Sequence, residues 1–512
     1  MTLVVLVVAA LGAGALVLVS ARASLTGDPT ALAKVGLPLG GGTIESVTVV
    51  TGPHSKRIPV YVSGTQIWPR GLVLAHRQVT IDVVIKRPGW IAWLAGKTER
   101  LRLTMYTPST RLRSHYLTLA PGAPLKLSFF SPVRVVAYGP PGQLRRHLLG
   151  APESEVTLDR AAPAGTIEVA AAPRTWEVSP AALVSWFPAG AATAAVASPA
   201  PGSSILPGTP ITLTFSKPVA RALGSSRPPV SPITPGTWHP VNAHTIVFRP
   251  MGYGYGLGQT VTVGLPSGVR LVGGLPRWTV PNGSTARLQQ LLALLGYLPL
   301  DFHYKGRGVA RTAQAEEAAA IRPPSGTFVW RYGNVPAALH SMWAPGVSGT
   351  MTRGAVMAFE NDNGITPDGV AGPTVWKALL AAILAGHRST FGYTFVMVSE
   401  GSPESLALWH NGQSLFSVPV NTGIPSAPTA TGTYPVYEHI SSGTMSGTNP
   451  DGSHYSDPGI PWISYFNGGD ALHGFYRAQY GFPQSLGCVE MTVSDAARVW
   501  PYTPVGTLVN VA

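Results

Sequence analysis

The sequence predicts a multidomain, mainly β protein, with one small α-helical module ahead of a β-rich C-terminal domain. The chain has 512 residues, more than a single hydrophobic core normally serves. It contains 58 Gly and 49 Pro but only 12% charged residues, a composition that favours short strands joined by turns. Apolar residues at helical spacing are concentrated in one segment, residues 284–385.

Residues 1–23 are predicted to direct export. Leu3 to Val19 contains only apolar residues and Gly, and its length of about 17 residues is at the lower limit for spanning a bilayer. The following Ala21-Arg22-Ala23 offers a small-x-small cleavage site, so a membrane anchor and a cleaved signal peptide both remain open. Either interpretation puts the rest of the chain outside the cytoplasm.

Residues 31–196 are predicted to be β-rich, in one or two modules, because short alternating runs such as 79–85 are separated by Pro and Gly. A stretch rich in Ala, Pro, Ser and Gly, from Pro188 to Ser204, is predicted to be a linker. Residues 205–280 then contain runs such as 211–215, spaced by turns as in a small antiparallel sandwich. This segment resembles the immunoglobulin-like spacers found ahead of wall-active catalytic domains, and a β module without a binding role is the alternative.

Residues 284–385 are predicted to form a helical module that carries an insertion, residues 301–349. Four leucines repeat at helical spacing and are followed by a Gly stop at position 296: Leu288, Leu291, Leu292 and Leu295. After the insertion, residues 351–376 read MTRGAVMAFENDNGITPDGVAGPTVW. The two halves together resemble the peptidoglycan-binding three-helix module of wall hydrolases. A purely structural helical module is the alternative.

Local signals in the second half of this module predict where its helices begin. Thr352 and Thr374 are expected to cap helices, because a threonine hydroxyl can accept a hydrogen bond from the first turn. Gly369 and Gly372 are expected to supply the turn between them.

Residues 391–512 are predicted to form a mostly β domain. Strand-like runs cover 394–398 and 405–409. Asn411-Gly412, placed before the run 414–416, is a strong signal for a tight hairpin.

Candidate catalytic residues lie in this last domain. Cys488 is the only cysteine, so it cannot form a disulfide within the chain; it is an intermolecular bridge, an inert thiol or a nucleophile. A thiol is a weak nucleophile until it loses its proton, and His473, 15 positions upstream, can take that proton and later give it to a leaving amine. Gly487 lacks a Cβ, which allows a tight turn whose backbone N–H groups approach a developing oxyanion.

The order His473-Gly474 followed by Ser485-x-Gly487-Cys488 resembles the L,D-transpeptidase catalytic domain. The resemblance implies that His473 and Cys488 are catalytic, that Gly487 forms the oxyanion turn, and that Gly474 and Ser485 support the motif. It also implies a location in the cell wall or at the outer face of the cytoplasmic membrane. Peptidoglycan stem peptides and glycan are the implied partners, with the membrane as a further one through the N-terminal segment, and no cofactor is expected.

The reaction implied by this resemblance begins when the thiolate attacks the carbonyl of the third stem residue and expels the terminal D-alanine. A side-chain amine of a second stem then resolves the thioester and forms a 3-3 cross-link. Resolution by water would instead give L,D-carboxypeptidase trimming. The family's sensitivity to carbapenems follows from the same acyl-enzyme. A catalytically silent wall-binding protein is the alternative from another class.

Two positions depart from the family pattern. Leu486 stands where many members have His, a loss that is tolerable if the backbone carbonyl at this position orients His473. Glu490 stands where Arg or Asn is usual. A carboxylate there would raise the pKa of a nearby thiol and repel an anionic substrate terminus.

Charge and motif content exclude several other classes of protein. The net charge of +13 suits an anionic partner, but the basic residues are scattered and no nucleic-acid motif accompanies them, so nucleic acid is not expected. The motif His-Glu-x-x-His and a metal-ligating set are absent from the sequence, so a zinc peptidase is not expected. His410, His439 and His454 are predicted to have surface or core roles.

Overall fold

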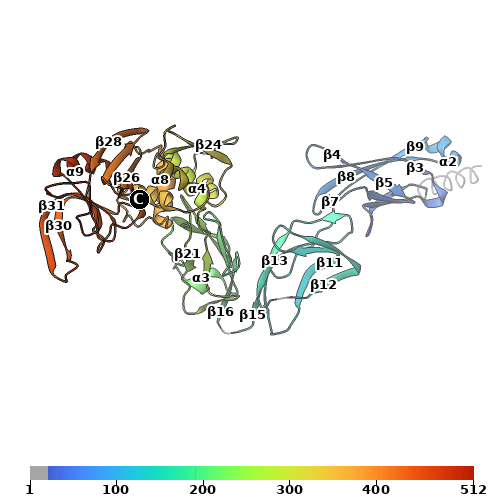
Figure 1. The fold of residues 1–512 in the computed structure, drawn as a ribbon. Helices are drawn as coiled ribbons and strands as arrows, with labels where there is room; N and C mark the ends of the chain where they lie inside the picture. Colours follow the sequence, from blue (N-terminus) through green and yellow to red (C-terminus); the bar gives the residue numbers. More distant parts are fainter. Residues whose placement is uncertain (1–20, 161, 191) are drawn as a thin grey trace, which may run out of the picture.

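The computed structural model describes residues 21–160, 162–190 and 192–512, which form a bent succession of compact units (Figure 1). The predicted fold class is confirmed: the described chain is mainly β, with most of its helices between residues 285 and 385. The predicted export segment, apart from its last three residues, lies outside the described residues.

The first unit contains two four-stranded sheets, in the orders β1-β2-β6-β5 and β4-β3-β8-β9. Its elements are β1 (Ser24–Gly27), β2 (Ala33–Gly36), η1 (Pro38–Gly40), β3 (Thr43–Thr51), β4 (Lys56–Ile58), β5 (Val60–Ser63), β6 (Gln66–Pro69), β8 (Gln78–Lys86), α2 (Gly89–Ala95) and β9 (Thr98–Tyr106). Alternate residues of β8, among them Val79, Ile81 and Val83, are buried in its core. This is the period-two pattern of a half-buried strand.

The second unit is a five-stranded sheet with its own core, in the order β10-β15-β13-β11-β12. Its strands are β10 (Tyr116–Leu119), β11 (Leu125–Gly139), β12 (Arg145–Leu158), β13 (Gly165–Ala172) and β15 (Ala182–Pro188). A short strand, β14 (Glu177–Val178), returns to the first unit and pairs with β7 (Val73–Leu74). Beside it, Trp176 packs into the first core and its Nε1 donates to the Thr30 carbonyl at 2.8 Å, so the two units are interlocked.

The third unit combines the sheets β19-β20-β17-β16-β22 and β18-β21-β23. Its elements are β16 (Thr193–Ser198), β17 (Ile211–Phe215), α3 (Val219–Leu223), β18 (Val230–Ser231), β19 (Gly236–Asn242), β20 (Thr245–Pro250), β21 (Thr260–Val263), β22 (Val269–Leu271) and β23 (Arg277–Thr279). Strand β16 lies within the predicted linker. Its small residues Ala194, Ala195 and Val196 are buried, and the strand pairs with β17 on one side and β22 on the other.

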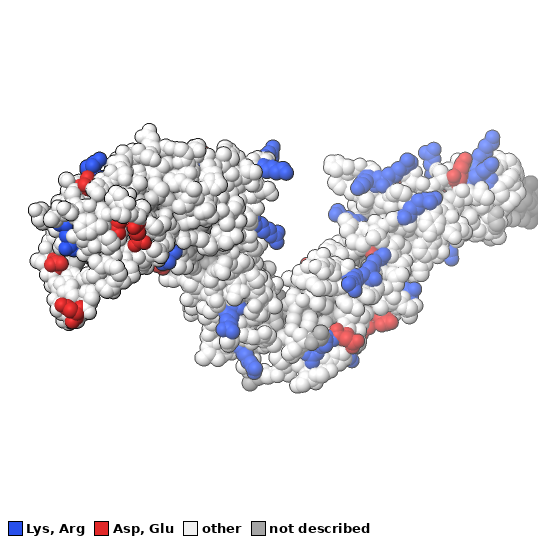
Figure 2. All heavy atoms as spheres, in the orientation of Figure 1, with Lys and Arg blue, Asp and Glu red and all other residues white. Residues whose placement is uncertain are grey.

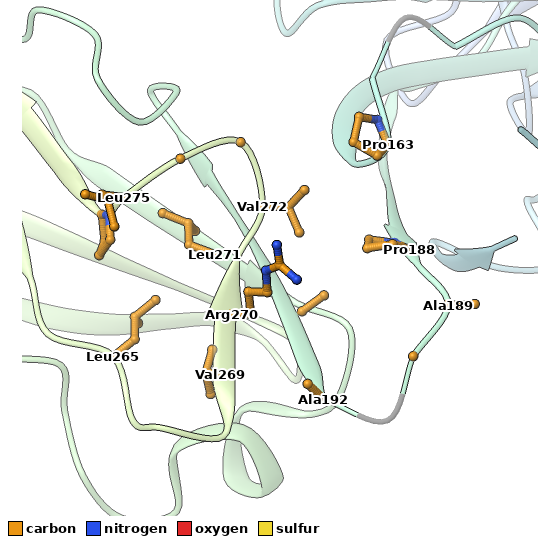
Figure 3. Close-up of a pocket in the computed structure, with 15 residues that line it drawn as sticks. Pro163, Pro188, Ala189, Ala192, Leu265, Val269, Arg270, Leu271, Val272 and Leu275 are labelled. Carbon is orange, nitrogen blue, oxygen red and sulfur yellow. The ribbon is translucent and has the colours of Figure 1, made fainter. Parts of the chain in front are cut away.

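A cavity of about 980 Å³ lies at the joint between the second and third units (Figure 3). Pro163 and Pro188 line one side, and Leu271 and Val272 the other. Among the described lining residues only Arg270 is charged, and none is a nucleophile or a carboxylate. The cavity therefore offers no catalytic chemistry.

The fourth unit is helical. Its elements are α4 (Thr285–Leu294), β24 (Leu300–Tyr304), α5 (Ala313–Ile321), β25 (Gly326–Trp330), α6 (Ala337–Ser341), α7 (Thr350–Asp362) and α8 (Pro373–Ala385). The Ser284 hydroxyl caps α4 by accepting from the Arg287 N–H at 3.1 Å. The predicted insertion supplies the hairpin β24–β25 and the short helix α6.

The two predicted threonine caps in this unit are wrong. Helix α7 begins after Gly349, so Thr352 lies inside it, buried, and accepts a hydrogen bond from Gln289 Nε2 at 3.0 Å. Helix α8 begins at Pro373 after Gly372, because proline needs no N–H partner in a first turn. Gly369 has a φ of +74°, as its predicted turn role requires.

The C-terminal unit has the sheets β28-β27-β26-β34-β29 and β30-β31-β32-β33. Its elements are β26 (Thr394–Ser399), β27 (Ser405–His410), β28 (Gln413–Pro419), β29 (Gly432–Pro435), β30 (Glu438–Thr448), β31 (His454–Asn467), β32 (Asp470–Gly474), β33 (Val489–Met491), α9 (Val493–Val499), η2 (Trp500–Tyr502) and β34 (Leu508–Val511). The hairpin predicted from Asn411-Gly412 is confirmed. Both residues have positive φ, and His410 pairs with Gln413.

The third, helical and C-terminal units share one continuous hydrophobic core. Tyr393, Phe395, Trp409 and Leu508 of the C-terminal unit belong to the same buried cluster as the helices and the third unit. Polar contacts follow the same seam, where the Tyr332 hydroxyl donates to Asn411 Oδ1 at 2.8 Å. These three units therefore pack as one body.

Candidate active site

His473 and Cys488 lie on adjacent parallel strands. His473 is on β32, Cys488 directly precedes β33, and the register pairs Leu472 with Val489 and His473 with Glu490. Leu472 and Val489 point into the main core of the domain. Because side chains alternate along a strand, His473 and Cys488 are on the opposite face of the two strands from this core.

On that face the two residues are diagonal neighbours. Cys488 packs against a small buried cluster that contains Ala471, two positions before His473. In the part of the chain that the structure describes, no hydrogen bond joins the sulfur to the imidazole. The Cys488 Sγ instead donates to the Gly469 carbonyl at 3.6 Å.

The His473 ring is buried and oriented by the backbone. Its side chain is only 3% exposed, its Nδ1 lies 3.1 Å from the Gly474 carbonyl, and its ring meets Phe475 edge-on. The orienting carbonyl therefore belongs to Gly474, not to Leu486. Donation from Nδ1 leaves the lone pair on Nε2. Burial lowers the pKa of His473, and the hydrogen bond to Gly474 raises it by less. The ring is therefore neutral at neutral pH.

The Cys488 thiol is half-buried and protonated at rest. Burial raises its pKa to about 12, and the negative charges of Asp470 and Glu490 raise it as well. A hydrogen bond from the Ala471 backbone lowers the pKa, but by less than burial raises it. The resting pair is therefore a neutral thiol with a neutral imidazole. Attack by sulfur from this state requires that the proton leaves during the reaction.

The turn before Cys488 is held by Ser485 and Gly487. The Ser485 hydroxyl donates to the Cys488 carbonyl at 2.5 Å and accepts from the Gly487 N–H at 3.3 Å. Gly487 has a φ of +117°, and a Cβ at this position would lie 2.4 Å from Asp470 Oδ1. Only glycine fits this turn without strain.

Two protein families match segments of the chain. The L,D-transpeptidase catalytic domain matches residues 394–511, and a peptidoglycan binding domain matches residues 338–379. The chain carries a C-terminal L,D-transpeptidase catalytic domain preceded by a peptidoglycan-binding domain. The family implies an extracytoplasmic location. No described helix is both long enough and apolar enough to cross a membrane.

Several solved structures are similar to this chain, while a comparison with curated proteins found no match. L,D-transpeptidase 3 from Mycobacterium tuberculosis is 12% identical, with 62% of this chain and 97% of that chain covered and a TM-score of 0.22. An L,D-transpeptidase from Mycobacterium smegmatis is 12% identical over 62% of this chain and 96% of that chain, with a TM-score of 0.21. The catalytic domain of the E. faecium L,D-transpeptidase is 22% identical over 24% of this chain and 100% of that chain, with a TM-score of 0.22. The assignment rests on the family matches.

Sequence reasoning missed the partner of Glu490 in the L,D-transpeptidase domain. Glu490 is 5% exposed and forms a two-point ion pair with Arg477, with Oε2–Nε and Oε1–Nη2 distances of 2.7 and 2.9 Å. The Arg477 guanidinium also lies over the Phe475 ring, 4.6 Å from its centroid. Arg477 thus gives the Glu490 carboxylate a charged partner, although Glu490 still acts to raise the pKa of Cys488, as expected. The signal in the sequence that could have revealed this partner is an arginine between the His473-Gly474 and Ser485-x-Gly487-Cys488 motifs.

A second missed element supports the same strand from the other side. Asn421 and Glu490 exchange backbone hydrogen bonds of 2.8 and 2.9 Å, and the Ser485 N–H donates to the Thr422 carbonyl at 3.0 Å. Thr422 is fixed in turn by the buried Glu404, whose carboxylate accepts from its N–H and hydroxyl at 2.7 Å each. This segment holds both the turn and β33 in place.

Gly474 and the remaining histidines have packing roles in the L,D-transpeptidase domain. A Cβ on Gly474 would lie 3.1 Å from the Val493 Cα, so glycine lets α9 approach β32. His410 contacts Thr394, His439 stacks on Trp500 with ring centroids 4.1 Å apart, and His454 contacts Thr448. No group of three or more His, Cys, Asp or Glu among the described residues is placed to hold a metal ion.

Proposed function

We propose that this chain is a peptidoglycan L,D-transpeptidase that forms 3-3 cross-links through a thioester on Cys488, with His473 as general base and then general acid. One observation carries the proposal. The single thiol and a neutral, backbone-oriented imidazole are diagonal neighbours on the same face of β32 and β33. The family match over residues 394–511 supports the substrate class.

In the first half-reaction, Cys488 Sγ attacks the carbonyl carbon of the third stem residue while Nε2 of His473 accepts the thiol proton. A neutral thiol with a pKa of about 12 cannot supply much free thiolate at neutral pH, so transfer to the imidazole accompanies attack. The tetrahedral intermediate collapses as the amide C–N bond breaks and the imidazolium protonates the departing D-alanine. Backbone N–H groups of the Gly487 turn are the proposed oxyanion donors.

In the second half-reaction, the side-chain amine of another stem attacks the thioester while Nε2 of the neutral His473 takes a proton from the attacking nitrogen. The C–S bond then breaks, and the imidazolium returns that proton to the sulfur. Water in place of the amine gives a trimmed stem and makes the enzyme an L,D-carboxypeptidase. Two features support peptidoglycan as the partner of the whole chain: the domain matched over residues 338–379, and its rigid attachment to the catalytic domain through the shared core. Anchored and secreted forms are both compatible with residues 1–23.

The test is intact-protein mass spectrometry after incubation with a carbapenem. A mass increase by one carbapenem in the wild type, absent in Cys488→Ala, is expected. A disaccharide-tetrapeptide substrate then separates the outcomes: dimers with D-alanine release indicate transpeptidation, and release without dimers indicates trimming. An unchanged adduct or unchanged D-alanine release in Cys488→Ala would refute the mechanism and leave a wall-binding protein.

A further inference from the structure

Helix α2 lies at the outer tip of the first unit (Figure 1) and carries two tryptophans. Trp90 and Trp93 are 49% and 79% exposed, whereas Ile91 on the same helix is buried. Trp93 Nε1 donates to the Trp90 carbonyl at 2.9 Å, so the polar atom of that ring is satisfied within the helix. The outward surface of α2 is therefore apolar and aromatic.

Basic side chains surround this apolar helix. Helix α2 has no charged residue, but it is flanked by the exposed Lys86 and Lys97. Arg22 and Arg100 are exposed at the same end of the unit, where Glu45 is the exposed acidic side chain. Lys and Arg predominate over this unit in the view of Figure 2. The tip thus combines an aromatic centre with a positively charged surround.

The chain enters the first unit at the base of the same helix. The Ala23 N–H donates to the Glu99 carboxylate at 3.5 Å, and Glu99 forms an ion pair with Arg87 at 3.2 Å. Arg87 stands two residues before Gly89, the first residue of α2. The described chain therefore begins close to the base of α2, and the segment 3–19, predicted to be an export segment or an anchor, precedes it in the sequence.

We propose that α2 is a membrane-contact element, with Trp90 and Trp93 at the headgroup level of an anionic bilayer and Lys86 and Lys97 against lipid phosphates. Tryptophan prefers this interface because its ring is apolar in body and polar at one edge, and lysine near the surface gains from anionic lipid. Helix α2 then forms a second contact beside the N-terminal segment. Two contacts fix the direction in which the first unit leaves the membrane, which a single contact cannot do.

The experiment uses the full chain reconstituted in vesicles of phosphatidylcholine, with or without phosphatidylglycerol. In a Cys488→Ser background, the thiol of Trp93→Cys is labelled with an environment-sensitive fluorophore. The matched control is Ile233→Cys, at a side chain of the third unit that is 97% exposed. A blue shift and quenching by nitroxide-labelled lipid are expected at position 93 and not at position 233, and both effects should increase with phosphatidylglycerol.

A probe at position 93 that stays as solvent-exposed in vesicles as the probe at 233 would overturn the proposal. So would a shift that depends on protein concentration and is not quenched by lipid, because the tip would then join copies of the chain. A second variant tests the tryptophans themselves. With Cys488 intact, Trp90→Ser with Trp93→Ser should keep the melting temperature and the rate of carbapenem acylation. In the Cys488→Ser background, the same two changes should abolish lipid quenching of a label at Lys97→Cys.

Discussion

Arg477 and Glu490 form a two-point ion pair that joins the loop after β32 to strand β33, with N–O distances of 2.7 and 2.9 Å. Glu490 is the register partner of His473 and lies two positions after Cys488. The pair therefore ties the strand of the proposed base to the strand of the proposed nucleophile. It also keeps a buried carboxylate next to the thiol from carrying an unopposed charge.

Replacing this arginine should damage both stability and reactivity. In Arg477→Gln the buried Glu490 loses its charged partner, so we expect the free energy of unfolding to fall by about 1–3 kcal/mol. Glu490 raises and Arg477 lowers the pKa of His473, so loss of the arginine should raise that pKa and move the pH profile of carbapenem acylation to higher pH. Urea unfolding and stopped-flow acylation measure these effects. The control is Arg498→Gln, which breaks an exposed pair with Asp495; equal effects in both variants would contradict an organising role.

The rate of acylation should depend on the protonation of His473. Burial lowers its pKa below 6.5, and only the neutral ring accepts a proton, so the rate should rise with pH to a midpoint below 6.5 and then level off. His473→Gln should lower the rate at neutral pH by about 10²–10⁴-fold and remove this limb. A pH series followed by mass spectrometry measures both. A limb that persists in His473→Gln would assign the base elsewhere.

Asp470 should hold the thiol in its protonated form. Its charge raises the pKa of Cys488, and its carboxylate also accepts from the Ala430 N–H at 3.1 Å. Asp470→Asn removes the charge but keeps an acceptor for that hydrogen bond. We therefore expect alkylation of Cys488 by iodoacetamide to have its pH midpoint at lower pH than in the wild type. An unchanged midpoint would show that burial alone sets the thiol pKa.

The turn at Gly487 should not tolerate a side chain. Gly487→Ala places a Cβ at a φ of +117° and 2.4 Å from Asp470 Oδ1, a strain of about 1–3 kcal/mol before the clash is relieved. Loss of carbapenem acylation and a lower melting temperature are expected. Gly469→Ala is the control, because no atom lies within 4 Å of a Cβ there. Wild-type activity in Gly487→Ala would remove the need for this backbone geometry.

Stability should decrease in mild acid because of His439, which is stacked on Trp500. Burial lowers its pKa from 6.5 to about 4. Between these pH values the imidazole binds a proton in the unfolded chain but not in the folded chain. The contribution of the neutral His439 ring to the free energy of unfolding is therefore complete above pH 6.5 and is lost as the pH falls toward 4. His439→Phe keeps a stacking ring without the proton, so its melting temperature should fall less between pH 7 and 4.5. If the melting temperatures of the wild type and of His439→Phe fall by the same amount over this pH range, the prediction is contradicted.

Local patterns predicted part of the candidate site. The order His473-Gly474 followed by Ser485-x-Gly487-Cys488 pointed to one site through its resemblance to a known family. Asn411-Gly412 predicted a hairpin because that signal lies within the turn it specifies. The site residues themselves stay a prediction until the variants above are measured. The Arg477–Glu490 pair could not be predicted, since it depends on how the intervening loop folds back onto β33.

Composition and capping rules failed where tertiary packing decided the outcome. The alanines of β16 resembled a linker, yet small side chains suit a strand enclosed between two others. Thr352 satisfied the rule for a helix cap, but its hydroxyl is bonded to Gln289 inside the helical unit. Neither choice is visible in the local sequence.

The core shared by the third, helical and C-terminal units determines how the protein can be divided for expression. A fragment that begins at residue 391 would uncover Phe395, Trp409 and Leu508, all fully buried in the intact chain, and should self-associate in solution. A cut near residue 190, between β15 and β16, leaves this shared core on one side of the cut. The smallest fragment that contains Cys488 and is expected to stay soluble without self-association therefore starts before β16 and includes the peptidoglycan-binding domain.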